Sequence, residues 1–285
     1  MTGRRKIELQ RRGLDEIREI MNSMKTLAYM ESRKLSHYLS MEHAMLANIE
    51  ITAADFVTAY PETLASGNTN KTAIVLVGSE RGFCGDFNVS VLRHLESIDG
   101  SSEKDTEPML IVVGHKLCSR FTDDARVVSL LEGAGVAEEV EAVLIRVVGI
   151  LSELQKQHGA LTVSAIYHAA GKNEIRTHQL IPTFKEYVDQ PLKFPVPPSL
   201  NVGPDQFLLE LLDQYLITAL QELFYNSLMA ENLQRAHDLE GAIQHLDNKS
   251  VELKRRSNAL RQEEIIEEIE VILLTATGLS KTQKT

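Results

Sequence analysis

Apolar residues recur every three or four positions in two long stretches, one at each end of the chain. The first covers residues 4–60 and the second residues 205–277, which contain no proline and a single glycine, Gly241. This spacing predicts amphipathic helices rather than strands. At about 1.5 Å per residue the C-terminal helix would extend on the order of 100 Å, beyond a domain of this size. The most economical cover for its apolar stripe is the N-terminal helix.

A different pattern separates these two helices. Short apolar runs rich in β-branched residues alternate with amphipathic segments, which predicts an open α/β (Rossmann-like) sheet domain. The predicted strands are 72–78, 109–114, 126–130, 161–168 and 174–181, and the predicted helices are 88–97, 115–121 and 136–158. The fold class is therefore α/β, with this sheet domain inserted into a long antiparallel two-helix coiled coil formed by the N- and C-terminal helices.

The division of the chain follows from these patterns. Residues 183–204 hold five of the eight prolines, so they form a linker that a helix or central strand cannot enter, and Asp205 is the predicted N-cap of the last helix. The predicted parts are an N-terminal helix, an α/β domain, a linker, a C-terminal helix and a tail, at residues 1–60, 72–182, 183–204, 205–277 and 278–285.

Composition and charge narrow the classes of function. The chain has 43% hydrophobic residues, which suffices for a core, and its net charge of −10 argues against a general nucleic-acid binder. Charge is uneven, because residues 1–35 carry nine Lys or Arg against five acids. Such a basic end indicates either an acidic partner or a solvated helix face. The basic block 249–261 and the glutamates of 263–270 are likewise partner contacts or solubilising residues.

The sequence has no secretory leader and no apolar run of about 20 residues, so we expect a soluble chain, which leaves docking on a membrane complex open. Cys84 and Cys118 lack CxxC spacing, which fits a reducing cytosol.

The loop Gly78–Asn88, with the sequence GSERGFCGDFN, is the first place to look for chemistry, because it follows a strand and precedes a helix. It lacks both GxGxxG spacing and the lysine of a P-loop, so we interpret its glycines as serving a tight turn and close packing rather than nucleotide binding. Cys84 has no base adjacent in sequence, and the histidines lack metal-ligand spacing. We expect no catalytic residues, no cofactor, no metal and no small-molecule substrate.

Several motifs together resemble those of the gamma subunits of rotary F-type ATP synthases. The loop Gly78–Asn88 is similar to the family's (S/T)-x-R-G-L-C-G-G-x-N, and Val113–Lys116 to its hydrophobic-G-x-K segment. Asn258, Arg261, Gln262, Ile265 and Glu268 resemble the signature N-x-x-R-Q-x-x-I-T-x-E, while Ala230, Glu231 and Arg235 fall on the segment S-E-x-x-A-R. The combination covers residues 7–277 in the family's order, which makes it more specific than any one motif.

The resemblance implies a central rotor shaft that couples proton or sodium translocation to ATP synthesis or hydrolysis. Its partners would be the alpha and beta subunits of the catalytic hexamer, the epsilon subunit and the membrane rotor ring of c subunits, with all nucleotide chemistry on the hexamer. It also implies a peripheral location on the cytoplasmic face of a bacterial inner membrane. The implied coupling contacts are Lys25, Arg235, Arg261, Gln262 and Glu268.

From about Asn248 onward we expect the last helix to have no partner within this chain, and to end in an apolar tip of Ile269, Ile272, Leu273 and Leu274.

The sequence departs from the family pattern at several positions, so the resemblance is to a divergent member. Leu27 stands where the family has its first methionine, Ile266 replaces the signature threonine, and Asp86 replaces a loop glycine. The alternative function is a non-rotary coiled-coil scaffold or adaptor whose α/β module binds a ligand.

Overall fold

The chain divides into two compact units in the computed structural model. One unit comprises residues 28–235, and the other comprises residues 1–27 together with residues 236–285. The structure describes residues 3–64, 71–99, 107–171, 174–184, 187 and 198–282, and side-chain exposure is described as far as Leu273. Two helices contribute to both units: α1, Gly3–Ala59, and α5, Pro204–Thr282.

A five-stranded sheet organises the unit of residues 28–235. Its strands lie in the order β3-β2-β1-β4-β5, and their bounds are β1 Lys71–Val77, β2 Met109–Val113, β3 Val127–Leu131, β4 Leu161–Ala169 and β5 Glu174–Ile181. Neighbouring strands are parallel except β4 and β5. The first four strands thus form the open α/β sheet that the alternating pattern predicts, and the antiparallel β5 extends one edge.

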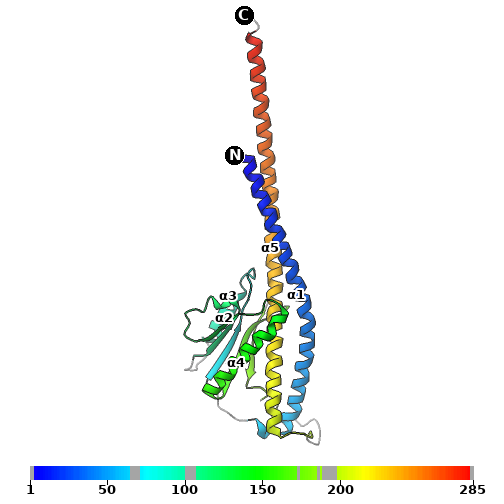
Figure 1. Cartoon of the computed structure of the whole chain (residues 1–285), viewed down its shortest axis with the longest axis vertical. Helices are drawn as coiled ribbons and strands as arrows, with labels where there is room; N and C mark the ends of the chain where they lie inside the picture. The colour runs from blue at the N-terminus through cyan, green and yellow to red at the C-terminus, as the bar shows by residue number, and fades with distance from the viewer. Residues whose placement is uncertain are drawn as a thin grey trace. The chain divides into compact units, whose positions relative to one another are not determined.

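Helices cover both faces of this sheet (Figure 1). On one face, α2, Phe87–Asp99, and α3, His115–Cys118, pack against a cluster that includes Leu76, Val112 and Ile166. On the other face, α4, Val140–His158, packs with parts of α1 and α5 into the larger core. Two short 3₁₀ helices, η1 Pro61–Thr63 and η2 Ala137–Glu139, precede β1 and α4. The domain core is therefore shared with the long helices.

Within this unit α1 and α5 run antiparallel with a repeating seam. Most buried residues of α1 are spaced by three, four or seven positions, as in a coiled coil: Ala28, Ser32, Leu35, Leu39, Leu46, Ile49, Ala53 and Phe56. Tyr38 stacks on Tyr225 with ring centroids 5.5 Å apart, and His43 lies 2.8 Å from Glu222. The pairing advances in opposite directions along the two helices, which confirms the predicted antiparallel coiled coil.

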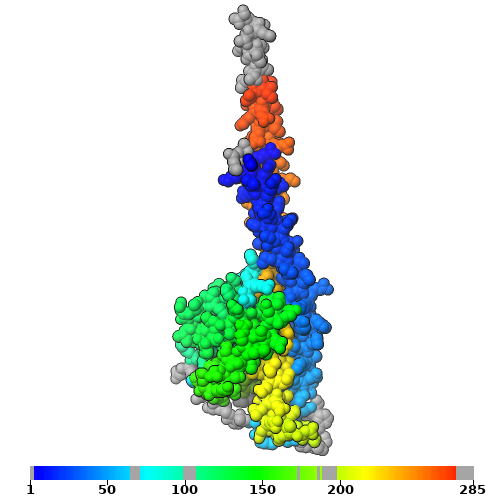
Figure 2. Space-filling view, in the orientation of Figure 1, coloured from blue at the N-terminus to red at the C-terminus, as the bar shows by residue number. Residues whose placement is uncertain are grey.

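The same antiparallel arrangement holds in the unit of residues 1–27 and 236–285. Lys25 pairs with Glu240, Arg18 with Asp247, and Arg4 with Glu264, while Ser250 Oγ donates to Asp15. The expectation that α5 has no partner within the chain beyond Asn248 is therefore wrong, because α1 accompanies it as far as Glu264. The ion pair Arg4–Glu264 joins the start of α1 to α5, and the orange and red part of α5 extends past the blue start of α1 (Figure 2).

The ends of the long helices differ in detail from the sequence-based expectations. Helix α5 begins at Pro204, which suits a first helical position because its missing N–H needs no partner there, so Asp205 lies inside the first turn rather than at the N-cap. At its other end α5 runs to Thr282, which places most of the expected tail in the helix. Most of the proline-rich linker 183–204 lies outside the described residues.

Across the described residues, no helix is both long enough and apolar enough to span a membrane.

Candidate functional site

The loop between β1 and α2 packs closely against the segment that follows β2. A Cβ atom added at Gly78 would lie 2.4 Å from Leu117 Cβ, and one at Gly114 would lie 2.6 Å from the Gly78 carbonyl oxygen. Gly114 also adopts a positive φ of 111°. Because only glycine tolerates both constraints, these two residues let the loop and the β2–α3 turn approach at backbone distance.

Side chains complete this loop from within. Asn88 Oδ1 accepts a hydrogen bond from the Ser79 N–H at 2.9 Å, and its Nδ2 donates to Ser79 Oγ at 2.8 Å. The Glu80 carboxylate accepts from the N–H groups of His115 and Gly133, at 2.9 and 2.6 Å. These hydrogen bonds join the two ends of the loop to each other, and they join Glu80 to the segments that follow β2 and β3.

Glu231 of α5 provides the central anchor for the loop. Its buried carboxylate accepts hydrogen bonds from the backbone N–H groups of Glu80 and Arg81, both at 3.1 Å. These are the amides that a strand–loop–helix turn would otherwise direct at a phosphate. The hypothesis of nucleotide binding at this loop loses its physical basis, because a carboxylate from the same chain already occupies the amides.

Arg235 lies one helical turn after Glu231 and holds the other side of the loop. Its Nη2 donates to Glu231 and, at 3.3 Å, to Cys84 Sγ, while Nε donates to the Gly82 carbonyl oxygen at 3.1 Å. Nη1 donates to Asn232 Oδ1 at 2.9 Å. The guanidinium therefore links α5 to two residues of the loop, Gly82 and Cys84. We name this network of Glu231, Arg235 and the loop 80–84 the loop anchor.

The electrostatics of the loop anchor depend on its burial. Removal from water raises the pKa of Glu231, whereas Arg235 and the two backbone amides act in the opposite direction. All the groups that face the carboxylate are donors, which suits an ionised acceptor. Hydrogen bonds to a buried ion pair are directional, so they fix the positions of the groups that form them. This network therefore fixes the position of the loop 80–84 on α5.

Arg235 was predicted to be a coupling contact, and the structure buries it at 4% exposure. Any contribution that it makes to a partner has to pass through the loop. Lys25, in the other unit, forms an ion pair with Glu240 at 2.6 Å across the two helices. This contact lowers the pKa of Glu240, chiefly through the hydrogen bond from Lys25. Both residues therefore act first within their own chain, and their roles as contacts to partners stay predictions.

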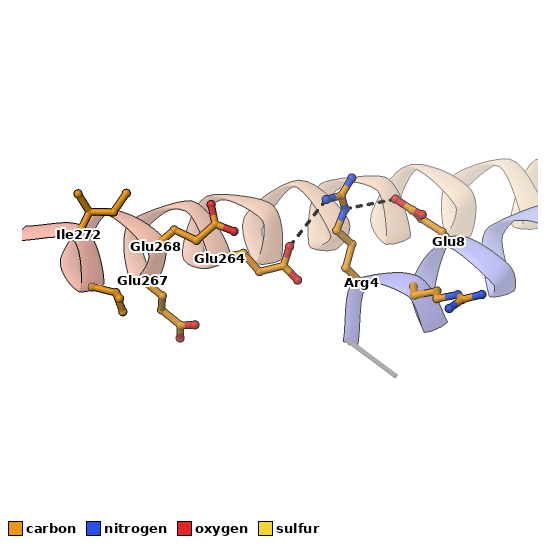
Figure 3. Close-up of a pocket in the computed structure, with 8 residues that line it drawn as sticks. Arg4, Glu8, Glu264, Glu267, Glu268 and Ile272 are labelled. Atoms are coloured by element: carbon orange, nitrogen blue, oxygen red, sulfur yellow. Dashed lines mark ion pairs between the residues drawn. The ribbon is translucent and has the colours of Figure 1, made fainter. Parts of the chain in front are cut away.

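Arg261, Gln262 and Glu268 lie exposed on α5. Glu268 lines an open groove of about 1050 Å³ at the start of α1, together with Arg4, Arg5, Glu8, Glu264, Glu267, Val271 and Ile272. Figure 3 shows Arg4 between two carboxylates, with ion pairs to Glu8 at 3.3 Å and Glu264 at 3.7 Å. The groove marks the step at which a two-helix rod becomes one helix.

The exposed tip of α5 is more apolar than expected. Ile265 and Ile266 are exposed in addition to the predicted Ile269, Ile272 and Leu273, while the side chain of Leu274 lies outside the described part. At 100° per residue, Ile265, Ile266 and Ile269 face away from Leu253 and Leu260, which lie on the α1 side. The tip therefore presents a new apolar stripe rather than a continuation of the seam.

Metal chemistry finds no support among the described residues, where no group of three or more His, Cys, Asp or Glu side chains could hold an ion. The residue that sequence reasoning missed is Glu231, whose role in the loop anchor was not foreseen. Its spacing of four from Arg235 was the available signal, since such a pair meets on one helix face.

Comparison with known proteins places these features in a family context. A family model described as ATP synthase matches residues 4–279. An ATP synthase gamma chain of Clostridium botulinum is 22% identical over 283 residues, covering 96% of this chain and 98% of the relative. One of Mycolicibacterium paratuberculosis is 23% identical over 253 residues, covering 83% and 82%.

Solved structures share the fold. A chain of the Euglena gracilis mitochondrial ATP synthase, from an OSCP/F1/c-ring structure, superposes with a TM-score of 0.65 at 14% identity, covering 99% of this chain and 96% of that chain. A chain of the Tetrahymena thermophila mitochondrial ATP synthase central stalk and c-ring superposes with a TM-score of 0.55 at 16% identity, covering 78% and 99%. The overall fold is thus shared with these two chains.

Proposed function

The chain belongs to the gamma-chain family of the ATP synthases, and from this premise we propose that it is the central rotor shaft of a rotary enzyme. It couples translocation of protons or sodium ions by a membrane ring to ATP synthesis or hydrolysis on an alpha–beta hexamer. The observation that carries this proposal is the tip of α5, which extends beyond the start of α1 and exposes Ile265, Ile266 and Ile269. An exposed apolar tip of this kind suits a sleeve formed by other chains.

The partners follow from the same premise. The alpha and beta subunits surround the end of the shaft that carries the tip of α5. The epsilon subunit and the ring of c subunits bind the α/β domain and the opposite end of the shaft. The chain itself contributes no catalytic site, and the occupation of the loop amides by Glu231 supports this part of the proposal. The matching bacterial relatives support a peripheral position on the cytoplasmic face of a bacterial inner membrane. The family match over residues 4–279 favours this function over a non-rotary scaffold.

A shaft has to resist torque and yet make few permanent bonds to its bearing. The apolar seam in residues 28–56 provides stiffness, since each large side chain that is fully buried contributes roughly 1.5 to 3 kcal/mol. Exposed Arg261 and Gln262 provide reversible contacts, through charge-assisted and neutral hydrogen bonds to the hexamer. Lys25, Arg235 and Glu268 complete the proposed coupling set, with Arg235 acting through the loop anchor.

Two measurements test the proposal separately. The first is the composition of the complex purified through a tag on this chain, for which we expect one copy with three alpha and three beta chains. A stable homodimer without these chains would contradict the rotor function itself.

The second measurement is coupling in membranes that contain the double variant Arg261→Ala with Gln262→Ala. We expect ATP turnover to persist while ATP-driven ion pumping falls, because the contacts that transmit torque are lost. Arg255→Ala is the matched control, since Arg255 is also an exposed arginine of α5. Unchanged coupling in the double variant would remove these two residues from the mechanism and leave the rotor function standing.

A further inference from the structure

The seam between α1 and α5 is unusually polar in the unit of residues 1–27 and 236–285. On α1 the seam positions alternate between basic and apolar residues, with the basic ones seven apart: Arg4, Arg11, Arg18 and Lys25. On α5 every seventh residue is leucine, at 239, 246, 253 and 260, and the intervening seam positions are Ile243, Ser250, Ser257 and Glu264. A coiled coil with cations at such positions loses stability, and it depends on their ion pairs.

The ion pairs cover only part of this seam. Lys25 and Arg18 bind Glu240 and Asp247, which occupy successive flanking positions seven residues apart on α5. The next two residues in that row are Lys254 and Arg261. The flanking row thus changes from acidic to basic as it approaches the start of α1.

The two remaining arginines of the α1 seam, Arg11 and Arg4, have no acidic residue of this flanking row beside them. Arg11 turns to Asp15 of its own helix, at 4.0 Å. Arg4 lies 3.3 Å from Glu8, also on α1, and 3.7 Å from Glu264 across the helices. These pairs are exposed, and exposed pairs contribute little to stability.

Net charge reinforces the contrast. Residues 3–14 carry five Lys or Arg and one Glu, a net charge of +4, while residues 251–262 carry four Lys or Arg and one Glu, a net charge of +3. The contacts Asp15–Ser250 and Arg4–Glu264 bracket these two stretches, so the stretches lie beside each other. At the very start of α1, Arg4 and Arg5 also lie beside Glu264, Glu267 and Glu268, which partly offset the repulsion there. Two stretches of net positive charge therefore face one another between these contacts, and Leu253 is the buried apolar residue of the α5 stretch.

We propose that residues 3–14 of α1 form an opening end, which separates from α5 and closes again while the Arg18–Asp247 and Lys25–Glu240 pairs keep residues 15–27 in place. The device is electrostatic: repulsion between the two basic stretches favours opening, and screening or neutralisation of that charge favours closure. Opening exposes the apolar residues Ile7, Leu14, Leu253 and Leu260. The inference rests on the charges and contacts alone and does not require the rotary function.

Hydrogen exchange of the isolated full-length chain, followed by mass spectrometry at low and at high NaCl, tests the proposal. At low salt we expect faster exchange in residues 3–14 than in residues 16–27. Raising the salt concentration should slow exchange in the first segment, because repulsion is screened, and leave it unchanged or faster in the second, because ion pairs weaken. Ordinary fraying of a helix end has no reason to show this opposite dependence on salt.

The variant Lys254→Glu gives the sharper test, because it continues the acidic row of Glu240 and Asp247 to the position beside Arg11. We expect it to slow low-salt exchange in residues 3–14 by about two- to five-fold, the effect of one added ion pair. Arg255→Glu is the matched control: the charge change is the same, and the adjacent position points away from α1.

Exchange in residues 3–14 that is no faster than in residues 16–27 at low salt would overturn the proposal. Equal effects of the two substitutions would overturn it as well, because they would show that total charge matters and the seam does not.

Discussion

Replacement of Arg235 by alanine is the most informative perturbation of the loop anchor. The substitution removes all the hydrogen bonds that the guanidinium donates, to Glu231, Gly82, Cys84 and Asn232. Glu231 stays buried with only the amides of Glu80 and Arg81 to stabilise it, so it either keeps an unpaired charge or takes up a proton, and both cost stability. The expected result is a large loss of stability that reflects the charge left behind.

The magnitude follows from burial on both sides of the pair. The side chains of Arg235 and Glu231 are 5% and 4% exposed, so solvent screens their interaction little. Removal of one partner from a buried ion pair costs about 3 to 5 kcal/mol. With a urea m-value of about 3 kcal/mol/M, the midpoint of unfolding should fall by more than about 1 M.

Urea unfolding, followed by circular dichroism and tyrosine fluorescence, measures this loss. Arg261→Ala is the matched control, because it removes the same side chain from an exposed position of the same helix. That change should alter the free energy of unfolding by less than about 0.5 kcal/mol. Arg235→Met, which keeps the length of the side chain, separates lost hydrogen bonds from lost packing and should resemble Arg235→Ala.

The double variant Glu231→Gln with Arg235→Met should lose less free energy of unfolding than the two single variants lose in sum. The reason is that the double variant contains no buried charge without a partner. A loss below about 1 kcal/mol for Arg235→Ala would refute the reasoning. It would mean that water or a rearranged loop satisfies Glu231, and that the loop anchor does not hold the domain on α5.

Two further predictions concern the α/β domain. Gly114→Ala should destabilise it by at least about 2 kcal/mol, because the added Cβ meets the Gly78 carbonyl oxygen at a positive φ; Gly149→Ala, where α4 offers open space, should instead stabilise it by about 0.5 to 1 kcal/mol in urea unfolding. Burial lowers the pKa of His168, which the nearby Asp86 only partly opposes. The unfolded chain therefore binds more protons, and stability should be lost as pH falls below about 6.5 towards the pKa of the folded state. Unfolding measured from pH 8 to 5 checks this, and a His168→Asn variant that keeps the full pH dependence would contradict it.

Local patterns account for the features that the sequence predicts well. The apolar spacing of residues 28–57 identifies helix α1, and the runs at 72–78 and 109–114 identify two central strands, because each element buries a periodic face. The glycines of the loop also announce its close packing. Gly78 fits this interpretation, since a Cβ there would lie 2.4 Å from Leu117 Cβ, whereas Gly82 has room for a Cβ.

Local sequence patterns do not predict contacts between segments that are distant in the sequence. Glu231 lies 151 residues after Glu80, and no local pattern indicates that its carboxylate faces that backbone amide. The basic N-terminal stretch suggested an acidic partner, and Arg18 and Lys25 find theirs in Asp247 and Glu240 of the same chain. The seven-residue spacing was visible, but the register between the two helices, which decides what each cation faces, is a property of the folded pair.

The carboxylate of Glu231 has a consequence for the redesign of this fold. It serves the loop as a built-in ligand, since it fills the position where a separate anion would bind the amides of Glu80 and Arg81. Shortening Glu231 to glycine would reopen an anion-sized space lined by those amides and Arg235, and inorganic phosphate could then restore the stability that the substitution removes.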